Sequence, residues 1–228
     1  MIKPVPVYSL LACLVFIMTC PLSASQASEE NRILNVAKKM EAAFQEVEDY
    51  TCEVEQVFYR GGVEDQRYRF KYYFKRKKRI RVDFYYPYPT LSLFYNGGDK
   101  EVTALPLRSI GFFKFHLSID NPKIRTVAGQ KINQTDMGYF IEFLSENLNK
   151  VPQGGEDFEE DGGQVKIWFQ ALDYIMGKTV ERYRISISKE TWLPVRIERY
   201  SLEEELLELT LIKNYTINTH LEDKLFNP

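Results

Sequence analysis

Apolar residues recur along this chain with two different periods. Between residues 29 and 48 they recur at steps of three and four, which predicts an amphipathic helix. From residue 50 onward the period is mainly two, as expected for strands with one buried face, and a second helix is predicted from Thr135. The segments with period two are 50–59, 66–75, 79–85, 91–95, 100–106, 165–169, 183–187, 193–197 and 207–211. The pattern therefore predicts about eight or nine antiparallel strands and two main helices.

Residues 67–89 combine aromatic rings with many cations, as a surface that stacks nucleic-acid bases would. In a strand, however, successive side chains point to opposite faces. The rings on one face are Tyr68, Phe70, Tyr72 and Phe74. The cations on the other face are Arg67, Arg69, Lys71 and Lys75. Because rings and cations are segregated, and because Glu53 and Glu55 can lie across from the cations, the pattern argues against nucleic-acid binding. It leaves the rings as core or as the lining of a cavity.

These strands together form one broad apolar face, which two helices cannot bury if the sheet stays flat. We therefore expect a mainly β (α+β) fold: a half-open, strongly curved antiparallel sheet, or unclosed barrel, with helices covering its mouth. A curled sheet of about eight strands can hold one small ligand. The composition, with 44% hydrophobic and 27% charged residues in a chain of 228, fits a single globular domain.

The first residues have the order of a secretory signal peptide. One cation, Lys3, precedes an apolar run over residues 7–20, and small residues follow within 23–27. The run is shorter than the ~20 residues that span a membrane. We expect residues 1–27 to be removed, leaving residues 28–228 as one exported, periplasmic domain whose single cysteine, Cys52, forms no internal disulfide. The alternative is acylation at Cys13 or Cys20, as in a bacterial lipoprotein.

We expect no catalytic, metal or cofactor site. The histidines, His116 and His220, have no second ligand type near them at metal spacing, and the motifs of serine hydrolases, zinc proteases and phosphate-binding loops are absent. The acidic stretch at residues 156–161 is interpreted as a solvated hairpin tip, and Cys52 as a small buried residue. The sequence therefore predicts a protein that is not an enzyme.

Two further segments carry alternative interpretations. The five consecutive cations are Lys75, Arg76, Lys77, Lys78 and Arg79. They form either a solvated hairpin turn or a surface that docks anionic lipid headgroups or an acidic partner. Residues 110–117, which include Phe112, Phe113 and Phe115, are predicted to be an apolar loop or short helix. That segment is interpreted as a lid, as a membrane-touching loop or as part of the core.

The segments "FKRKKRIRVDFYYPYP" and "LFYNGGDKEVTALP" and the last strands, with Phe226, resemble the LolA-like family of periplasmic lipoprotein carriers. The stretch "FKRKKRIRVDFYYPYP" is similar to the family's strand–turn–strand pattern K-R-P-x-x-F-R-W, with Lys75-Arg76 and Ile80-Arg81-Val82 at the conserved positions. The stretch "LFYNGGDKEVTALP" resembles the following hairpin, V-x-D-G-K…W-x-Y-x-P, and the last strands and Phe226 resemble the end of the family. The departures are Lys77 for proline, Val82 for tryptophan and Gly98-Asp99 for Asp-Gly.

The resemblance implies a helix-capped, unclosed barrel whose apolar cavity shields acyl chains. Its expected lining is Tyr68, Phe70, Tyr72, Phe74, Ile80, Val82, Phe84, Leu91 and Leu93. The implied function is a periplasmic carrier that binds acyl chains of lipoproteins or other lipids and moves them between envelope membranes. Its implied partners are the inner- and outer-membrane lipoprotein-sorting complexes and, transiently, the membrane surface. The alternative is a non-enzymatic envelope sensor or assembly protein that uses the same fold to bind a lipid or protein partner.

Overall fold

The computed structural model describes residues 23–107, 113–148, 158–173, 175 and 177–228. Most of the predicted signal peptide lies outside these residues, and its removal stays a prediction. The predicted cleavage position after Ala27 falls inside the first helix, α1 (Ser23–Gln45). This helix ends three residues earlier than the sequence pattern indicated, and the turn that follows it buries Val47.

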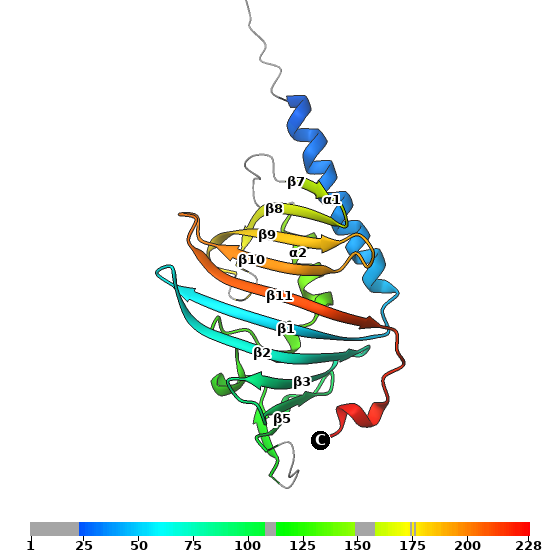
Figure 1. The fold of residues 1–228 in the computed structure, drawn as a ribbon, viewed down its shortest axis with the longest axis vertical. Coiled ribbons are helices and arrows are strands. Elements are labelled where there is room, and N and C mark those ends of the chain that lie inside the picture. Colours follow the sequence, from blue (N-terminus) through cyan, green and yellow to red (C-terminus); the bar gives the residue numbers. More distant parts are fainter. Residues whose placement is uncertain (1–22, 108–112, 149–157, 174, 176) are drawn as a thin grey trace, which may run out of the picture.

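The described strands form one antiparallel sheet with the order β6-β5-β4-β3-β2-β1-β11-β10-β9-β8-β7 (Figure 1). They are β1 (Asp49–Arg60), β2 (Val63–Lys75), β3 (Arg79–Tyr86), β4 (Ser92–Tyr95), β5 (Glu101–Leu105), β6 (Phe115–Ser118), β7 (Phe158–Asp161), β8 (Gln164–Leu172), β9 (Val180–Ser188), β10 (Pro194–Tyr200) and β11 (Leu206–Ile217). β6 and β7 are the two edges, so the sheet is not closed. The predicted fold class, a curved and unclosed antiparallel sheet with helices, is confirmed.

The sheet has 11 strands within the described residues, more than the sequence pattern indicated. The two additional strands are the edges, β6 and β7, which have four residues each. Neither edge strand contains a buried residue, so no buried face marks it in the sequence; β4, which is equally short but buried throughout, was recognised. Residues 115–118 are therefore part of the sheet, which corrects the prediction of a loop or short helix for this part of 110–117; residues 108–112 lie outside the description.

Helix α2 (Met137–Asn147) lies behind the sheet in Figure 1 and packs on what we call the inner face. It starts two residues later than predicted, because Asp136 caps it: the Asp136 carboxylate accepts a hydrogen bond from the Tyr139 N–H at 3.0 Å. Its buried residues include Phe140, Ile141 and Leu144. The two helices meet closely at Gly138, where an added Cβ would lie 2.5 Å from a ring carbon of Phe44.

Two clusters of buried residues occupy the inner face. The first joins α1 and α2 to β8 and β9 and includes Met40, Leu144, Ile167, Phe169, Tyr183 and Ile185. The second covers β1 to β5 and includes Tyr50, Cys52, Tyr72, Phe74, Ile80 and Val102. The cover over the second cluster consists of two short 3₁₀ helices, η1 (Pro122–Ile124) and η2 (Ile132–Gln134), and the start of α2.

The outer face of β1 and β2 carries the predicted charge pairs. In the strand register Glu53 lies opposite Lys71 and Glu55 opposite Arg69. Glu55 forms ion pairs with Arg67 and, at 3.3 Å, with Arg69. The predicted segregation of rings and cations is confirmed, because Tyr72 and Phe74 are buried on the inner face while these cations pair with carboxylates on the outer face.

Candidate lipid-binding cavity

A cavity of about 150 Å³ lies between the inner face of the sheet and its cover. The sheet contributes Cys52, Val54, Gln56, Tyr68, Phe70, Tyr72, Val82, Phe84, Leu93, Ile197, Glu208, Thr210 and Ile212. The cover contributes Ile124, Arg125, Thr126, Gln130, Ile132, Gln134, Thr135, Asp136, Met137 and Phe140. Because most of these side chains are apolar or aromatic, the cavity offers a low-polarity surface for a ligand.

The strand register arranges the sheet side of the cavity in rows. One row is Cys52, Tyr72, Val82 and Leu93. The next is Val54, Phe70, Phe84 and Ile212. The third is Gln56, Tyr68, Thr210 and Ile197. Aromatic rings recur in these rows because β2 carries one at every second position, as its alternating sequence requires.

One end of the cavity is closed by tightly packed rings. Tyr50, Phe74 and Ile80 form the row beyond Cys52 and are 0%, 4% and 0% exposed. The rings of Tyr50 and Phe74 are stacked with centroids 5.0 Å apart. A ligand that occupies the cavity therefore cannot pass through this end without displacing core side chains.

Two hydrogen bonds hold the start of α2 over this closed end. The hydroxyl groups of Tyr72 and Thr135 are 3.0 Å apart, and the Met137 N–H donates to the Tyr50 hydroxyl at 3.3 Å. Burial raises the pKa values of Tyr50 and Tyr72 well above the ordinary tyrosine value, so both phenols remain protonated and uncharged. The cover is thus attached to the sheet by neutral hydrogen bonds.

Asp136 lies between the cavity and an outer groove of about 580 Å³ that α1, α2 and the β2–β3 turn surround. Its carboxylate is 2% exposed, and Oδ2 has no hydrogen-bond partner among the described residues. The Lys78 ammonium is 3.8 Å from Oδ2. Burial raises the pKa of this carboxyl above its usual range, and the Lys78 charge opposes that shift. The group therefore favours the protonated form more than an exposed aspartate does.

A row of polar side chains crosses the inner face at the other end of the cavity. Gln56 Nε2 donates to Glu208 Oε1 at 2.7 Å, and the Arg199 guanidinium lies 3.1 Å from both the Glu208 and Glu181 carboxylates. These residues are each less than a tenth exposed. Burial raises the pKa of Glu181, whereas Arg199 opposes that shift. Because each carboxylate accepts hydrogen bonds from Arg199, the buried charges are paired.

Six of the nine predicted lining residues line this cavity. They are Tyr68, Phe70, Tyr72, Val82, Phe84 and Leu93. Phe74 and Ile80 instead belong to the closed end, and Leu91 packs half-buried against the core without lining the cavity. Phe74 and Ile80 depart from the expected lining because the packing around them is complete, at 4% and 0% exposure. The lipid-binding role of all nine stays a prediction.

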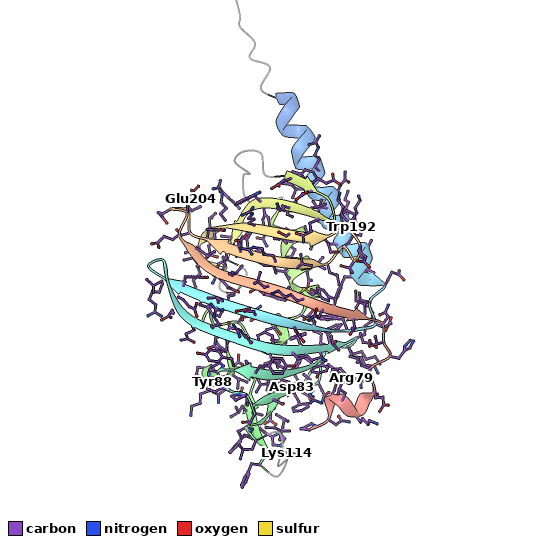
Figure 2. All side chains as sticks on the ribbon, in the orientation of Figure 1. Arg79, Asp83, Tyr88, Lys114, Trp192 and Glu204 are labelled. Carbon is purple, nitrogen blue, oxygen red and sulfur yellow. The ribbon has the colours of Figure 1, made fainter. Side chains whose placement is uncertain are left out.

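Most of the five cations at residues 75–79 bond to other groups of the protein and are therefore not available to dock a partner. Lys75 and Arg79 pair with Asp223 at 2.6 and 2.8 Å, and Figure 2 shows Arg79 next to the last helical turn, η3 (Asp223–Phe226). Arg76 donates to the Phe44 carbonyl at 3.1 Å. Hydrogen bonds from Lys75 and Arg79 lower the pKa of Asp223. Of the five cations, Lys77 and Lys78 have the weakest such contacts, since Lys78 lies 3.8 Å from Asp136, and both line the outer groove as the remaining candidates for docking.

The predicted lid segment is exposed rather than part of the core. Phe113 and Phe115 are 61% and 53% exposed, and Phe112 lies outside the described residues. Figure 2 places Lys114, between these two rings, at the end of the molecule away from α1, and Tyr88 at the side of the same half, at the height of Asp83. Tyr85, Tyr86, Tyr88 and Leu107 are exposed as well, and a hydrogen bond of 2.6 Å from Thr90 to the Pro106 carbonyl joins their two loops. We call these six exposed side chains the apolar tip.

Sequence reasoning missed the cover and the polar row. The cover lies in an irregular segment without a period. Gln56 interrupts the apolar face of β1 at a single position. Glu208 and Thr210 belong to the face that the alternation of residues 207–211 assigned to solvent, whereas the structure places them on the inner face, opposite Phe58 and Gln56. Within the described residues, no group of three histidine, cysteine or acidic side chains is arranged to hold a metal ion. In the same part of the chain, none of the helices has the length and apolar character needed to cross a membrane.

Comparison with known proteins gives matches in structure alone. The sequence matches no protein-family model and no curated protein. Mycobacterium tuberculosis lipoprotein LppX matches with a TM-score of 0.51 and 9% identity, over 84% of this chain and 98% of that one. LprF from Mycobacterium bovis matches with a TM-score of 0.50 and 8% identity, over 84% and 95%.

A LolA superfamily protein from Nitrosomonas europaea matches with a TM-score of 0.36 and 12% identity, over 88% of this chain and 98% of that one. At these identities a structural match concerns the fold and not the ligand. The architecture agrees with the resemblance that the sequence motifs indicated, namely one unclosed antiparallel sheet with helices on its inner face. The chain thus shares the fold of LppX and LprF.

Proposed function

We propose that this protein is a periplasmic carrier that binds acyl chains in the cavity and moves them between envelope membranes. The observation that carries the proposal is the cavity itself: an apolar, ring-lined space between a curved sheet and a cover. Each methylene group removed from water contributes about 0.8 kcal/mol. An apolar cavity is therefore sufficient to hold a lipid without any bond being made or broken.

The size of the cavity indicates that the cover moves when a lipid binds. At about 150 Å³ it is smaller than the roughly 300–1,000 Å³ of typical small-ligand sites. The cover contains two short 3₁₀ helices and is attached by the Tyr72–Thr135 and Tyr50–Met137 hydrogen bonds. Displacement of this segment enlarges the space over the rows that contain Phe70 and Tyr72.

The apolar tip supplies the contact with membranes in this proposal. Aromatic side chains with a polar end, such as Tyr86 and Tyr88, favour the membrane–water interface. Lys114 lies between Phe113 and Phe115 and adds a cation that anionic headgroups attract. Delivering and receiving complexes for lipoproteins are the partners that a carrier of this kind requires.

The proposal is tested by transfer of acyl chains between two vesicle populations. Mature protein from Ser28, purified without detergent, is expected to carry lipid in native mass spectrometry and to accelerate transfer of labelled lipid from donor to acceptor vesicles. Protein that stays lipid-free after incubation with vesicles and lipoproteins contradicts the carrier function. Lipid uptake without transfer, except when a protein partner is added, supports the sensor alternative, for which the outer groove beside Lys77 and Lys78 is the docking surface.

A further inference from the structure

The polarity of the cavity changes along the strands. The rows that contain Cys52 and Val54 are apolar, except for the Tyr72 hydroxyl, which bonds to the cover. The third row contains Gln56 and Thr210, and Glu208 follows it on β11. A chain of methylene groups is favoured against the first two rows and disfavoured against the third, where buried charges are paired. On its sheet side the cavity therefore has a tail end and a polar end; on its cover side the tail end also carries Asp136, whose carboxylate lies 3.8 Å from the Lys78 ammonium.

The cover contributes polar side chains to that same end. An added Cβ at Gly129 would lie 3.8 Å from Ile175, in the loop between β8 and β9. The Ile175 N–H donates to Asp173 at 3.1 Å, and this loop leads into Glu181 of the polar row. The turn that begins at Thr126 is thus next to the polar end, and Thr126, Gln130 and the adjoining Arg125 all line the cavity.

The carboxylates of the polar end already have partners. Glu208 accepts hydrogen bonds from Gln56, Thr210 and Arg199, and Glu181 accepts from Arg199. Arg125 differs, because its Nε is buried and has no hydrogen-bond partner among the described residues. A buried donor without a partner costs free energy, and a ligand that accepts from it removes that cost. An acceptor oxygen that reaches this Nε when the cover moves therefore gains a hydrogen bond at this end of the cavity.

The position of Arg125 suits the head of an amphiphile. Its side chain is 31% exposed, so the guanidinium lies at the boundary between the cavity and solvent. Its Nη2 donates to the Asp120 carbonyl at 2.9 Å and pairs with the Asp120 carboxylate at 3.3 Å. Lys131 pairs with the same carboxylate at 2.6 Å. Two cations thus share one carboxylate, which leaves net positive charge. The Thr126 hydroxyl accepts from the Gln130 N–H, and its own proton remains available to a ligand.

We propose that the cavity takes an amphiphile with a single acyl chain and an anionic oxygen head, a carboxylate or a phosphate, with the head bound by Arg125 and Thr126 and the tail along the Val54 and Cys52 rows. This inference rests on the proposed acyl-chain binding and adds the class and orientation of the ligand. Guanidinium groups bind both kinds of anionic head through charge-assisted hydrogen bonds. The uncharged ester and amide groups of a lipoprotein anchor satisfy this position less well.

The test is calorimetric titration with ligands that share one tail and differ in the head: dodecanoate, dodecyl phosphate, dodecanol and dodecylamine, with inorganic phosphate as the head alone. Dodecanoate and dodecyl phosphate are expected to bind at least about tenfold more tightly than dodecanol. Arg125→Gln is expected to remove this preference and to leave dodecanol binding unchanged. Lys123→Gln, which removes an exposed cation from the same segment without touching the cavity, is the matched control and keeps the preference.

Each other outcome overturns the inference in a recognisable way. Equal binding of dodecanoate and dodecanol, or tighter binding of dodecylamine, rejects the anionic head while acyl-chain binding stands. Inorganic phosphate that binds as tightly as dodecyl phosphate shows an anion site independent of the cavity. Failure of all tailed ligands to bind rejects the proposed function as well. Should Arg125→Gln not fold, the preference of the unaltered protein between dodecanoate and dodecanol decides.

Discussion

The two halves of the inner face have the same alternating sequence pattern but different packing. Over β8 and β9, Ile167, Phe169, Tyr183 and Ile185 are at most 1% exposed. Over β2 and β3, Phe70 and Phe84 occupy equivalent inner positions but are only half-buried, and they line the cavity. The strands alone therefore do not decide whether an apolar face becomes core or cavity; the segment that covers it does.

The covers differ in regularity. Two helices cover β8 and β9, and their stripes, which include Val36, Met40, Phe140 and Leu144, fill the space above the strands. Short 3₁₀ turns cover β2 and β3, and they bring few large side chains, of which Ile124 and Ile132 reach the cavity. The space between these turns and the strands stays unfilled because a 3₁₀ turn presents no continuous apolar ridge.

Replacing a ring in the packed half has the largest expected effect. Phe169→Ala should lower the free energy of unfolding by about 3–5 kcal/mol, since it leaves a cavity between fully packed neighbours. Phe84→Ala is the matched variant and should cost less, because Phe84 already borders a cavity. Denaturant titration measures both. Equal losses for the two variants would show that the two halves are packed alike.

Filling the cavity with a larger side chain tests the difference between the two halves by its effect on ligand affinity. Ile212→Phe enlarges a side chain that lines the cavity and is expected to weaken acyl-chain binding about tenfold or more, at a stability cost of about 1–3 kcal/mol. Leu211→Phe, the next residue, points to the outer face and is the control. Unchanged lipid affinity in a folded Ile212→Phe variant would place the binding site elsewhere.

Loosening the cover has a smaller effect. Tyr72→Phe removes the hydroxyl that is 3.0 Å from Thr135 and is expected to reduce stability by about 1 kcal/mol while speeding lipid exchange. Hydrogen exchange of the first turn of α2 and lipid off-rates measure the two consequences. Tyr59→Phe, in β1 but outside both the cavity lining and the apolar tip, should change neither. Unaltered exchange in Tyr72→Phe would mean that this hydrogen bond does not hold the cover.

The smallest expected effect concerns pH. The pKa of Asp136 is raised in the folded protein, so its proton is bound more tightly there than in the unfolded chain. Stability from this group is therefore present at low pH and is lost as the pH rises through the raised pKa. Asp136→Asn keeps an oxygen for the Tyr139 N–H and cannot ionise. Its stability relative to the unaltered protein should rise from acid to neutral pH in urea titrations; a pH-independent difference would contradict the raised pKa.

Much of the fold follows from the sequence because strands longer than four residues carry a readable period. The alternation in residues 66–75 predicted both the inner rings and the outer ion pairs of Glu55. Edge strands such as β6 were missed because none of their residues is buried, so no apolar face marks them. Capping at Asp136 could have been recognised from an aspartate that precedes the apolar stripe of α2.

The site was harder to predict because it depends on tertiary packing. Phe70 and Phe74 have the same spacing and chemistry, yet one lines the cavity and the other is sealed beneath α1 and Tyr50. Arg125 lies in an irregular segment with no pattern to mark it. Similarly, the contacts of Lys75 and Arg79 with Asp223 join residues far apart in sequence, which no local pattern reveals.

Photo-crosslinking tests the central claim, that acyl chains bind between the sheet and its cover, most directly. A fatty acid with a photoreactive group near the end of its chain would be bound to the protein, activated and located by peptide mass spectrometry. The account predicts adducts on the inner positions of β1 to β3, at Cys52, Val54, Phe70 or Val82. Adducts confined to the outer face or to the apolar tip would contradict it.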